Sequence, residues 1–350
     1  MRTLTATGRR AEIDALRVLA CFMVICIHVI FEAWHVPSVK SFAWQCLNLC
    51  NSFVRGCVPV FAMISGIHFL REEKPISVLF RKYILRMFLI YLLWVVLYAV
   101  DEVGLRALRS AEGLEKLFRL CAEGKYHLWY LACTVGAYLL VPLLWCVARW
   151  KDGKYLKYLC YLFLLASALQ IVAYLLPKRE LFLTAYSLLA PGVTAFPMLM
   201  LLGYYVYEKG GFPWSNGKCL VLFFVTVLLT AAANGALSWH KGEPLSDLLG
   251  NFSFSSVFEG LCLLILFRNI GTASLFTGHS RLWLRLSSCT LGIYLIHVFV
   301  LEHLASWFSI DVSFAPLPVS LPALAVGVFL ISLAVVALLR RIPFVGKWIV

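Results

Sequence analysis

The sequence predicts an all-α, polytopic integral membrane protein, a bundle of about ten transmembrane helices with both termini in the cytoplasm. Hydrophobic residues make up 62% of the 350 positions and charged residues only 14%, with a mean hydropathy of +0.86. A soluble globular protein has about 25% charged residues. The apolar residues also fall in runs of about 20, the length that a helix needs to cross a bilayer. A soluble core is therefore excluded.

The apolar runs that meet this length criterion give the expected spans. They lie at residues 16–34, 52–70, 83–100, 128–148, 156–176, 189–207, 219–239, 253–270, 288–308 and 319–340. The sixth is short and is interrupted by Pro191, Gly192 and Pro197. The longest connection, residues 101–127, carries mixed charges and is expected to form an amphipathic surface helix. Since there is no internal repeat and no loop long enough for a soluble domain, residues 1–350 are expected to form one membrane domain.

The distribution of basic residues predicts the orientation of the bundle. The chain has 31 Lys and Arg against 18 Asp and Glu, a net charge of +13. The basic residues gather before the first expected span, in alternate loops and after the last span, as the positive-inside rule requires of cytoplasmic segments. Nucleic-acid binding is not needed to explain them, since no loop carries a recognition motif. The basic N-terminal segment lacks a signal-peptide cleavage site, so the first run is expected to be a retained span.

The 12 cysteines predict neither a disulfide framework nor a metal site. Most lie in or beside apolar runs, where a cysteine behaves as a small hydrophobic residue. The sequence has no Cys-x-x-Cys pair and no cluster of Cys and His with zinc-ligand spacing. We therefore expect no bound metal.

The first expected span carries more ionisable residues than a plain membrane anchor. The stretch from Asp14 to Trp34 also contains Arg17, His28 and Glu32. Such groups are costly in lipid and usually face a bundle interior or a wet cavity. Arg17 and His28 are eleven residues apart, which returns them to nearly the same helix face with about 16 Å of rise between them. One face of this helix thus combines a permanent cation near one membrane surface with a titratable imidazole deeper in the bilayer.

Five stretches, in chain order, carry a resemblance to a known family. They are the Asp14-x-x-Arg17 and Arg17-x10-His28 spacing, VPVFAMISG from Val58 to Gly66, RKYILR from Arg81 to Arg86, HLWYL from His127 to Leu131 with Tyr138 and Pro142 after it, and SSCTLGIYLIH from Ser287 to His297. Together they resemble the membrane-bound acyltransferase family 3, whose members transfer acetyl or related groups from acyl-CoA to sugars and other envelope molecules. The resemblance extends over nearly the whole chain and implies an integral membrane O-acyltransferase.

Two positions depart from the family pattern. The third helix often shows Arg-x-x-Arg, but Tyr83 stands three residues before Arg86. Arg81 or Lys82 is expected to substitute from a neighbouring turn, although Lys lacks the bidentate fork of Arg. Ala62 replaces the second Phe of a Phe-Phe pair, which is expected to leave a wider pocket.

The resemblance and the chemistry of imidazole make His28 the expected catalytic residue. A neutral imidazole accepts the proton of an acceptor hydroxyl near pH 7, or it attacks the thioester itself and carries the acyl group. The alternative is a core histidine that bonds to a neighbouring helix. Glu32, one turn further along, is expected to orient His28 as the acidic member of a triad does, or else to be a solvated surface carboxylate.

Cations near the cytoplasmic end are expected to bind the phosphates of acyl-CoA. Arg17 would do so by charge-assisted hydrogen bonds, with Asp14 holding it from three residues earlier. The alternative is an Arg that only anchors the helix end. Arg86, inside the third apolar run, is expected to face the same cavity. Arg81 and Lys82 are candidates for donor contact or else ordinary loop charges.

A third set of residues is expected near the acceptor. It comprises Arg55, His127, Trp129, Tyr294 and His297. Trp129 would stack on a sugar ring or anchor the helix in the interface. Tyr294 and His297, three apart on one helix face, would line the cavity or bond between helices. Ser65 is expected to be structural, in a segment where Gly66 lets helices approach closely.

The expected function is transfer of an acetyl group from cytoplasmic acetyl-CoA to a hydroxyl of an envelope glycan or lipid-linked sugar. Acetyl-CoA is the cosubstrate, and no bound cofactor is expected. The expected location is the bacterial inner membrane. Two alternatives remain: a transporter-like module of the same superfamily, for small-molecule or amino-acid uptake without acyl transfer, and a sensor or scaffold that has lost the chemistry.

Overall fold

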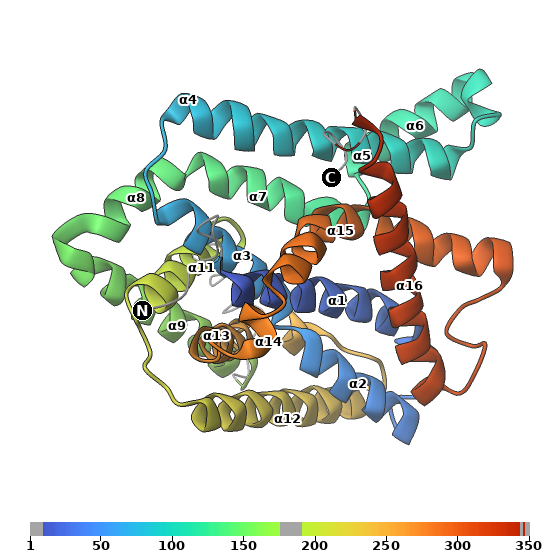
Figure 1. Ribbon diagram of the computed structural model, residues 1–350. Coiled ribbons are helices and arrows are strands. Elements are labelled where there is room, and N and C mark those ends of the chain that lie inside the picture. Colours follow the sequence, from blue (N-terminus) through green and yellow to red (C-terminus); the bar gives the residue numbers. More distant parts are fainter. Residues whose placement is uncertain (1–9, 176–190, 344–345, 347–350) are drawn as a thin grey trace.

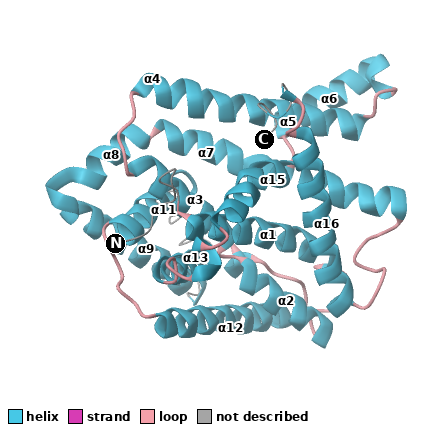
Figure 2. Cartoon of the chain, viewed as in Figure 1, coloured by secondary structure: helices cyan, strands magenta, loops and turns pink. Residues whose placement is uncertain are grey.

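The computed structural model describes residues 10–175, 191–343 and 346. These residues form helices joined by loops and turns and contain no strand, which confirms the all-α fold (Figure 2). Within this part of the chain, seven helices are long and apolar enough to cross a membrane, or up to eight if a bent pair counts as one span. A multi-pass membrane bundle is thereby confirmed, whereas the count of ten spans and the cytoplasmic termini stay predictions.

The main helices follow one another along the chain with short connections. They are α1 (Ala11–Ala33), α2 (Phe42–Val54), α3 (Cys57–Leu70), α4 (Ile76–Val78), α5 (Leu85–Val103), α6 (Ala111–Glu123), α7 (Trp129–Leu139), α8 (Val141–Arg149), α9 (Lys154–Leu175), α11 (Pro191–Glu208), α12 (Asn216–Lys241), α13 (Phe254–Asn269), α14 (Ser274–Thr277), α15 (Ser280–Phe308) and α16 (Leu317–Leu339). Two short turns also shape the site: η1 (Leu79–Ile84) and η3 (Tyr126–Leu128).

The first helix runs through the middle of the bundle (Figure 1). α1 contacts α2, α3, α13, α14, α15 and α16, which come from both halves of the sequence. Leu16, Ala20, Ile25 and Val29 on this helix are each only 1% exposed. Burial of these apolar side chains among six helices makes α1 the element around which the others pack.

The second expected span, 52–70, begins too late. The continuous helical segment that includes α2 and α3 starts at Phe42, ten residues earlier. The early start was missed in the sequence because residues of α2 are polar, although they are buried in the structure. Asn48 Nδ2 donates to the carbonyl oxygen of Ala231 at 2.7 Å, and Asn234 Nδ2 donates to Asn48 Oδ1 at 2.9 Å. Because these bonds to α12 satisfy the amides, the helix can enter the apolar region with them.

The fourth expected span, 128–148, is not one straight helix. α7 ends and α8 begins on either side of Leu140, and the helical segments that meet there are bent by 58°. Pro142 lies in the first turn of α8, where its missing N–H is tolerated, whereas inside a continuous helix it would remove a hydrogen bond. The sequence criterion of 20 apolar residues does not register such a break.

A π-helical turn interrupts the helix that carries the basic third motif. α4, η1 and α5 form one continuous segment from Ile76 to Val103. The π turn covers Leu79–Ile84 and therefore includes Arg81, Lys82 and Tyr83. Such turns often occur at functional sites because they shift the side chains that follow onto another face.

The expected close approach of helices at Gly66 is confirmed. A Cβ atom on Gly66 would lie 1.9 Å from the carbonyl oxygen of Met200, and one on Gly203 would lie 2.2 Å from that of Met63. The backbones of α3 and α11 are therefore in direct contact, with no room for a side chain between them. Small residues provide this packing in membrane bundles.

The stretch 101–127 contains the expected surface helix. α6 (Ala111–Glu123) begins at Ser110, whose side chain accepts a hydrogen bond from the backbone N–H of Gly113 at 3.1 Å. Most of its side chains are exposed or half-buried. The chain continues from α6 into η3, and residues of η3 line the cavity described below.

Candidate active site

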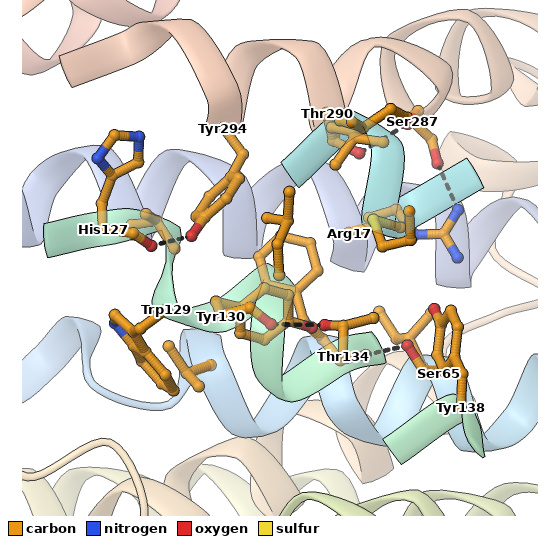
Figure 3. Close-up of a pocket in the computed structure, with 18 of the residues that line it drawn as sticks. Arg17, Ser65, His127, Trp129, Tyr130, Thr134, Tyr138, Ser287, Thr290 and Tyr294 are labelled. Atoms are coloured by element: carbon orange, nitrogen blue, oxygen red, sulfur yellow. Dashed lines mark hydrogen bonds between the residues drawn. The ribbon is translucent and has the colours of Figure 1, made fainter. Parts of the chain in front are cut away.

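A cavity lies against α1, and its walls include most of the residues singled out from the sequence. Its volume is about 660 Å³, within the range of small-molecule sites. Helices α1, α3, α5, α7 and α15 supply its walls (Figure 3). Of the expected site residues, those that line it are Arg17, His28, Arg55, Ser65, Lys82, Arg86, His127, Trp129 and Tyr294.

Arg17 stands at one end of the cavity. Its Nη1 donates to Ser287 Oγ of α15 at 3.1 Å and lies 3.7 Å from Asp14 Oδ1 (Figure 3). The expected support of Arg17 by Asp14 is thus present, and Ser287 adds a second contact from another helix. Two partners restrict the guanidinium to one position at the cavity wall.

Three further cations share this end with Arg17. Lys82, Arg86 and Arg340 also line the cavity. Arg340 follows the last turn of α16, and its Nη1 donates to Ser288 Oγ and to Cys289 Sγ, the latter at 3.2 Å. These four cations come from three parts of the chain: α1, the segment that includes η1 and α5, and the end of α16. We call the group the basic mouth; it consists of Arg17, Lys82, Arg86 and Arg340.

Arg81 does not line the cavity, and its side chain is exposed. Lys82 and Arg86 are four residues apart and lie on one helix face, whereas Arg81 is one position away and turns outward. Arg81 and Lys82 were the two candidates to replace the first Arg of the family's Arg-x-x-Arg pattern. The geometry favours Lys82. Tyr83, which occupies the family's Arg position, also lines the cavity.

His28 stands eleven residues further along α1, among other rings. The centroid of its imidazole lies 5.0 Å from that of His297, 5.4 Å from Tyr126 and 6.3 Å from His127. The side chain is half-buried and faces the cavity. α1, η3 and α15, which are distant in sequence, therefore bring three histidines together around one end of the cavity.

His127 and Tyr294 are fixed to each other. The hydroxyl of Tyr294 donates to the backbone carbonyl oxygen of His127 (Figure 3). His127 is only 2% exposed, and neither ring nitrogen forms a well-aligned hydrogen bond among the described residues, although the backbone of Leu295 lies near the ring. Because an unpartnered buried polar atom is costly, a side chain of this kind on a cavity wall is suited to bonding a ligand.

The wall beside the histidines contains a buried cation. Arg55, only 7% exposed, donates from Nε to Asn51 Oδ1 at 2.9 Å and lines the cavity. Glu259 of α13 is fully buried and close enough to interact electrostatically with Arg55. Trp129 and Asn251 line the same cavity, so an aromatic face, an amide and a guanidinium are available to one ligand.

Besides Asp14 and Arg81, two expected site residues, Glu32 and His297, lie outside the cavity wall. Glu32 is exposed, does not line the cavity and forms no hydrogen bond or ion pair within the described part of the chain, but it is close enough to the cavity residue Tyr126 to interact with it electrostatically. His297 is fully buried, with 0% of its surface exposed, and lies behind His28. The orienting role of Glu32 therefore stays a prediction, while the ring of His297 is in contact with the imidazole of His28.

Ser65 and Ala62 on α3 differ in what they face. Ser65 lines the cavity, and its hydroxyl donates to the carbonyl oxygen of Phe61 at 3.0 Å. Ala62 is fully buried and is not part of the wall. The expectation that Ala62 widens the pocket is therefore wrong, because this side of α3 packs into the protein; Phe61, one position earlier, faces the cavity instead.

Sequence reasoning missed several cavity residues. Those that carry polar groups include Tyr126, Tyr130, Asn251, Ser287 and Arg340. Ser287 lies inside one of the family motifs, and Tyr126 directly precedes another. Their position in or beside a motif could have marked both as cavity residues. Arg340 looked like an ordinary positive-inside charge, and Asn251 lies in a loop with no motif. Only the packing of α16 and of the loop before α13 brings these two to the site.

One comparison with known proteins identifies the chain. The family model described as "Acyltransferase domain", of acyltransferase family 3, matches residues 10–341. The chain belongs to acyltransferase family 3. No curated protein and no solved structure matches it. This family-3 protein is thus a multi-pass membrane acyltransferase, and its cavity is the candidate active site.

The acyltransferase cavity contains no evident metal centre. Among the described residues, no group of three or more His, Cys, Asp or Glu side chains is arranged to hold a metal ion. Arg, Lys and His side chains line it instead: guanidinium and ammonium groups, which are able to bind anions, and imidazoles, which are able to accept and donate protons.

Proposed function

We propose that this acyltransferase moves an acetyl group from acetyl-CoA to a hydroxyl of an envelope glycan or lipid-linked sugar. One observation carries the proposal: Arg17 and His28, on the same helix, line the same cavity at positions about 16 Å apart. Acyl-CoA is polyanionic at its nucleotide end and reactive at the thioester of its extended arm. A cavity with cations at one end and imidazoles at the other suits that molecule.

The basic mouth would bind the donor. Arginine forms bidentate, charge-assisted bonds with phosphates, and Arg17, Arg86 and Arg340 are joined there by Lys82. The donor arm would then extend along α1 toward His28. The positive-inside rule places this mouth on the cytoplasmic side, where acetyl-CoA is made. A bacterial inner membrane would supply both a bilayer for the helices and a cytoplasmic face that contains acetyl-CoA.

His28 would act at the thioester. In the simplest scheme, its unprotonated nitrogen takes the proton of the acceptor hydroxyl while the oxygen attacks the thioester carbonyl. The carbon–sulfur bond breaks, and the protonated imidazole returns the proton to the thiolate of CoA. In the covalent scheme, the imidazole attacks first and then passes the acyl group to the acceptor. Both schemes end with an acetyl ester and free CoA.

The acceptor would enter near Arg55, Trp129 and Asn251. An indole ring stacks on sugar faces, while amide and guanidinium groups bond hydroxyl or acidic groups of the acceptor. The sequence motifs look most like those of the O-acetyltransferase of enterobacterial common antigen. That likeness supports an envelope polysaccharide, or its lipid-linked precursor, as the acceptor class.

Release of free CoA from acetyl-CoA by the purified protein in nanodiscs tests the proposal. Wild-type protein is compared with His28→Ala and with the control His35→Ala, which changes an exposed histidine outside the cavity. We expect His28→Ala to lose about 100-fold or more of the activity and His35→Ala to retain it. Equal release by wild type and His28→Ala would overturn the role of His28. Transport of a small molecule without any CoA release would favour the transporter alternative.

A further inference from the structure

His297 has one ring nitrogen in use and one unused. Its Nδ1 lies 2.6 Å from the carbonyl oxygen of Tyr294 in the preceding turn of α15. A carbonyl oxygen can only accept, so Nδ1 must carry the hydrogen. In the neutral ring, Nε2 is then a hydrogen-bond acceptor. This nitrogen is buried, and no partner for it exists among the described residues.

Of the three rings whose distances from the ring of His297 are known, the candidate catalytic imidazole of His28 is the nearest. The ring centroids of His297 and His28 are 5.0 Å apart, with an angle of 48° between their planes. If one nitrogen of each ring is turned toward the other ring, this centroid separation brings the two nitrogens within hydrogen-bond distance. His127 is further from His297, at 5.4 Å. Catalytic hydrogen bonds are often long in the absence of substrate and tighten when it binds.

We propose that His297 is a positioning residue for His28. Nε2 of His297 accepts a hydrogen bond from one ring nitrogen of His28, which leaves the other nitrogen of His28 unprotonated and directed into the cavity. The backbone carbonyl of Tyr294 fixes the tautomer of His297 and so completes the chain of bonds. The arrangement does for His28 what an acidic side chain does in a catalytic triad.

The scaffold around His297 is suited to holding this chain in place. His297 is fully buried, and α15 is fastened next to it by Tyr98 of α5. The Tyr98 hydroxyl donates to the carbonyl oxygen of Leu295 at 2.8 Å and accepts from the backbone N–H of Phe299 at 3.1 Å. A tyrosine that bonds the backbone on both sides of His297 limits movement of that turn.

Two substitutions of His297 distinguish the positioning of His28 from a purely structural role in packing. In His297→Asn, the side-chain amide occupies the place of Nδ1 and can still donate to Tyr294, but nothing replaces Nε2. In His297→Gln, the amide oxygen reaches the place of Nε2 and can still accept from His28. A purely structural role is preserved by Asn, whereas the positioning role is preserved by Gln.

The first measurement is the rate at which diethyl pyrocarbonate modifies His28 at pH 7, followed by peptide mass spectrometry. The reagent acylates an unprotonated imidazole nitrogen and needs neither donor nor acceptor substrate. We expect His297→Asn to slow modification of His28 about tenfold or more and His297→Gln to stay close to wild type. The exposed His240, outside the cavity, is the internal control in every variant. Unchanged modification in His297→Asn, or equal loss in both variants, overturns the proposal.

If neither variant folds, a measurement on the wild-type protein tests the proposal. In ¹⁵N spectra of histidine-labelled protein, His297 should show a pyridine-type Nε2 and a protonated Nδ1; a protonated Nε2 would overturn the proposal. The proposal rests on the role of His28 in the proposed function. That function is tested by CoA release from wild-type protein and His28→Ala, so the failure of one can be told from the failure of the other.

Discussion

Arg17 and His28 line one cavity from the same face of α1, three turns apart on a helix that contacts six others. The cavity thus has a cationic end and an imidazole end that are held at a fixed separation by a single rigid element. Changes at the two ends should therefore have different effects: those near Arg17 on donor binding, and those near His28 on turnover.

Arg340 should contribute to donor binding although no motif marks it. It lines the basic mouth, whereas its neighbour Arg341, which is also exposed, does not. We expect Arg340→Ala to raise the KM for acetyl-CoA about tenfold, the value of one charge-assisted hydrogen bond, and Arg341→Ala to leave it unchanged. Initial rates of CoA release over a range of acetyl-CoA concentrations measure both. The same KM for both variants would remove Arg340 from the donor site.

Lys82 and Arg81 form a second matched pair. Lys82 lines the cavity on the same helix face as Arg86, and Arg81 does not. Lys82→Ala should weaken acetyl-CoA binding about fivefold to tenfold, and Arg81→Ala should change it by less than about twofold. Calorimetric titration with CoA compares them directly. A larger effect at Arg81 would mean that the π turn directs the other side chain to the donor.

Arg55 should matter for the acceptor half of the reaction. Its Nε is held by Asn51, and the side chain lines the cavity next to the histidines. We expect Arg55→Gln to leave the dissociation constant of acetyl-CoA unchanged and to lower turnover about tenfold or more, because the group that bonds the acceptor is lost. CoA binding and CoA release are measured on the same preparation. Loss of donor binding in this variant would place Arg55 with the basic mouth instead.

Gly66 should be sensitive to the smallest substitution. A Cβ atom there would lie 1.9 Å from the carbonyl oxygen of Met200, whereas one on Gly327 in α16 would meet no atom within 4 Å. Gly66→Ala should therefore destabilise the protein by about 2 kcal/mol or more, since α3 and α11 must move apart. Gly327→Ala is the control. Thermal unfolding in detergent measures both, and equal melting temperatures would refute direct contact of the two backbones.

The sequence predicted the parts of this protein that depend on composition and periodicity. The all-α membrane fold, the central first helix, the Asp14–Arg17 contact and the close packing at Gly66 follow from apolar runs, spacing of three and small residues. The bend near Pro142 and the early start of α2 did not, because they depend on how neighbouring helices satisfy polar groups such as Asn48.

The site was predictable to the extent that helix spacing determines it. Arg17 and His28 share a face because eleven residues are close to three turns. Glu32 was assigned to the same site by proximity in sequence, but the contact to His28 comes from His297, in a helix near the other end of the chain. Which of two candidate partners meets an imidazole depends on tertiary packing, which one sequence does not contain.

The dissociation constant of acetyl-CoA for three proteins, the wild type, Arg17→Ala and His28→Ala, tests the two-ended cavity most directly. The account predicts that Arg17→Ala binds about tenfold more weakly than wild type. It also predicts that His28→Ala binds as tightly as wild type while its release of CoA is lost. Weaker binding in His28→Ala, with normal binding in Arg17→Ala, would contradict the assignment of the donor and reaction ends.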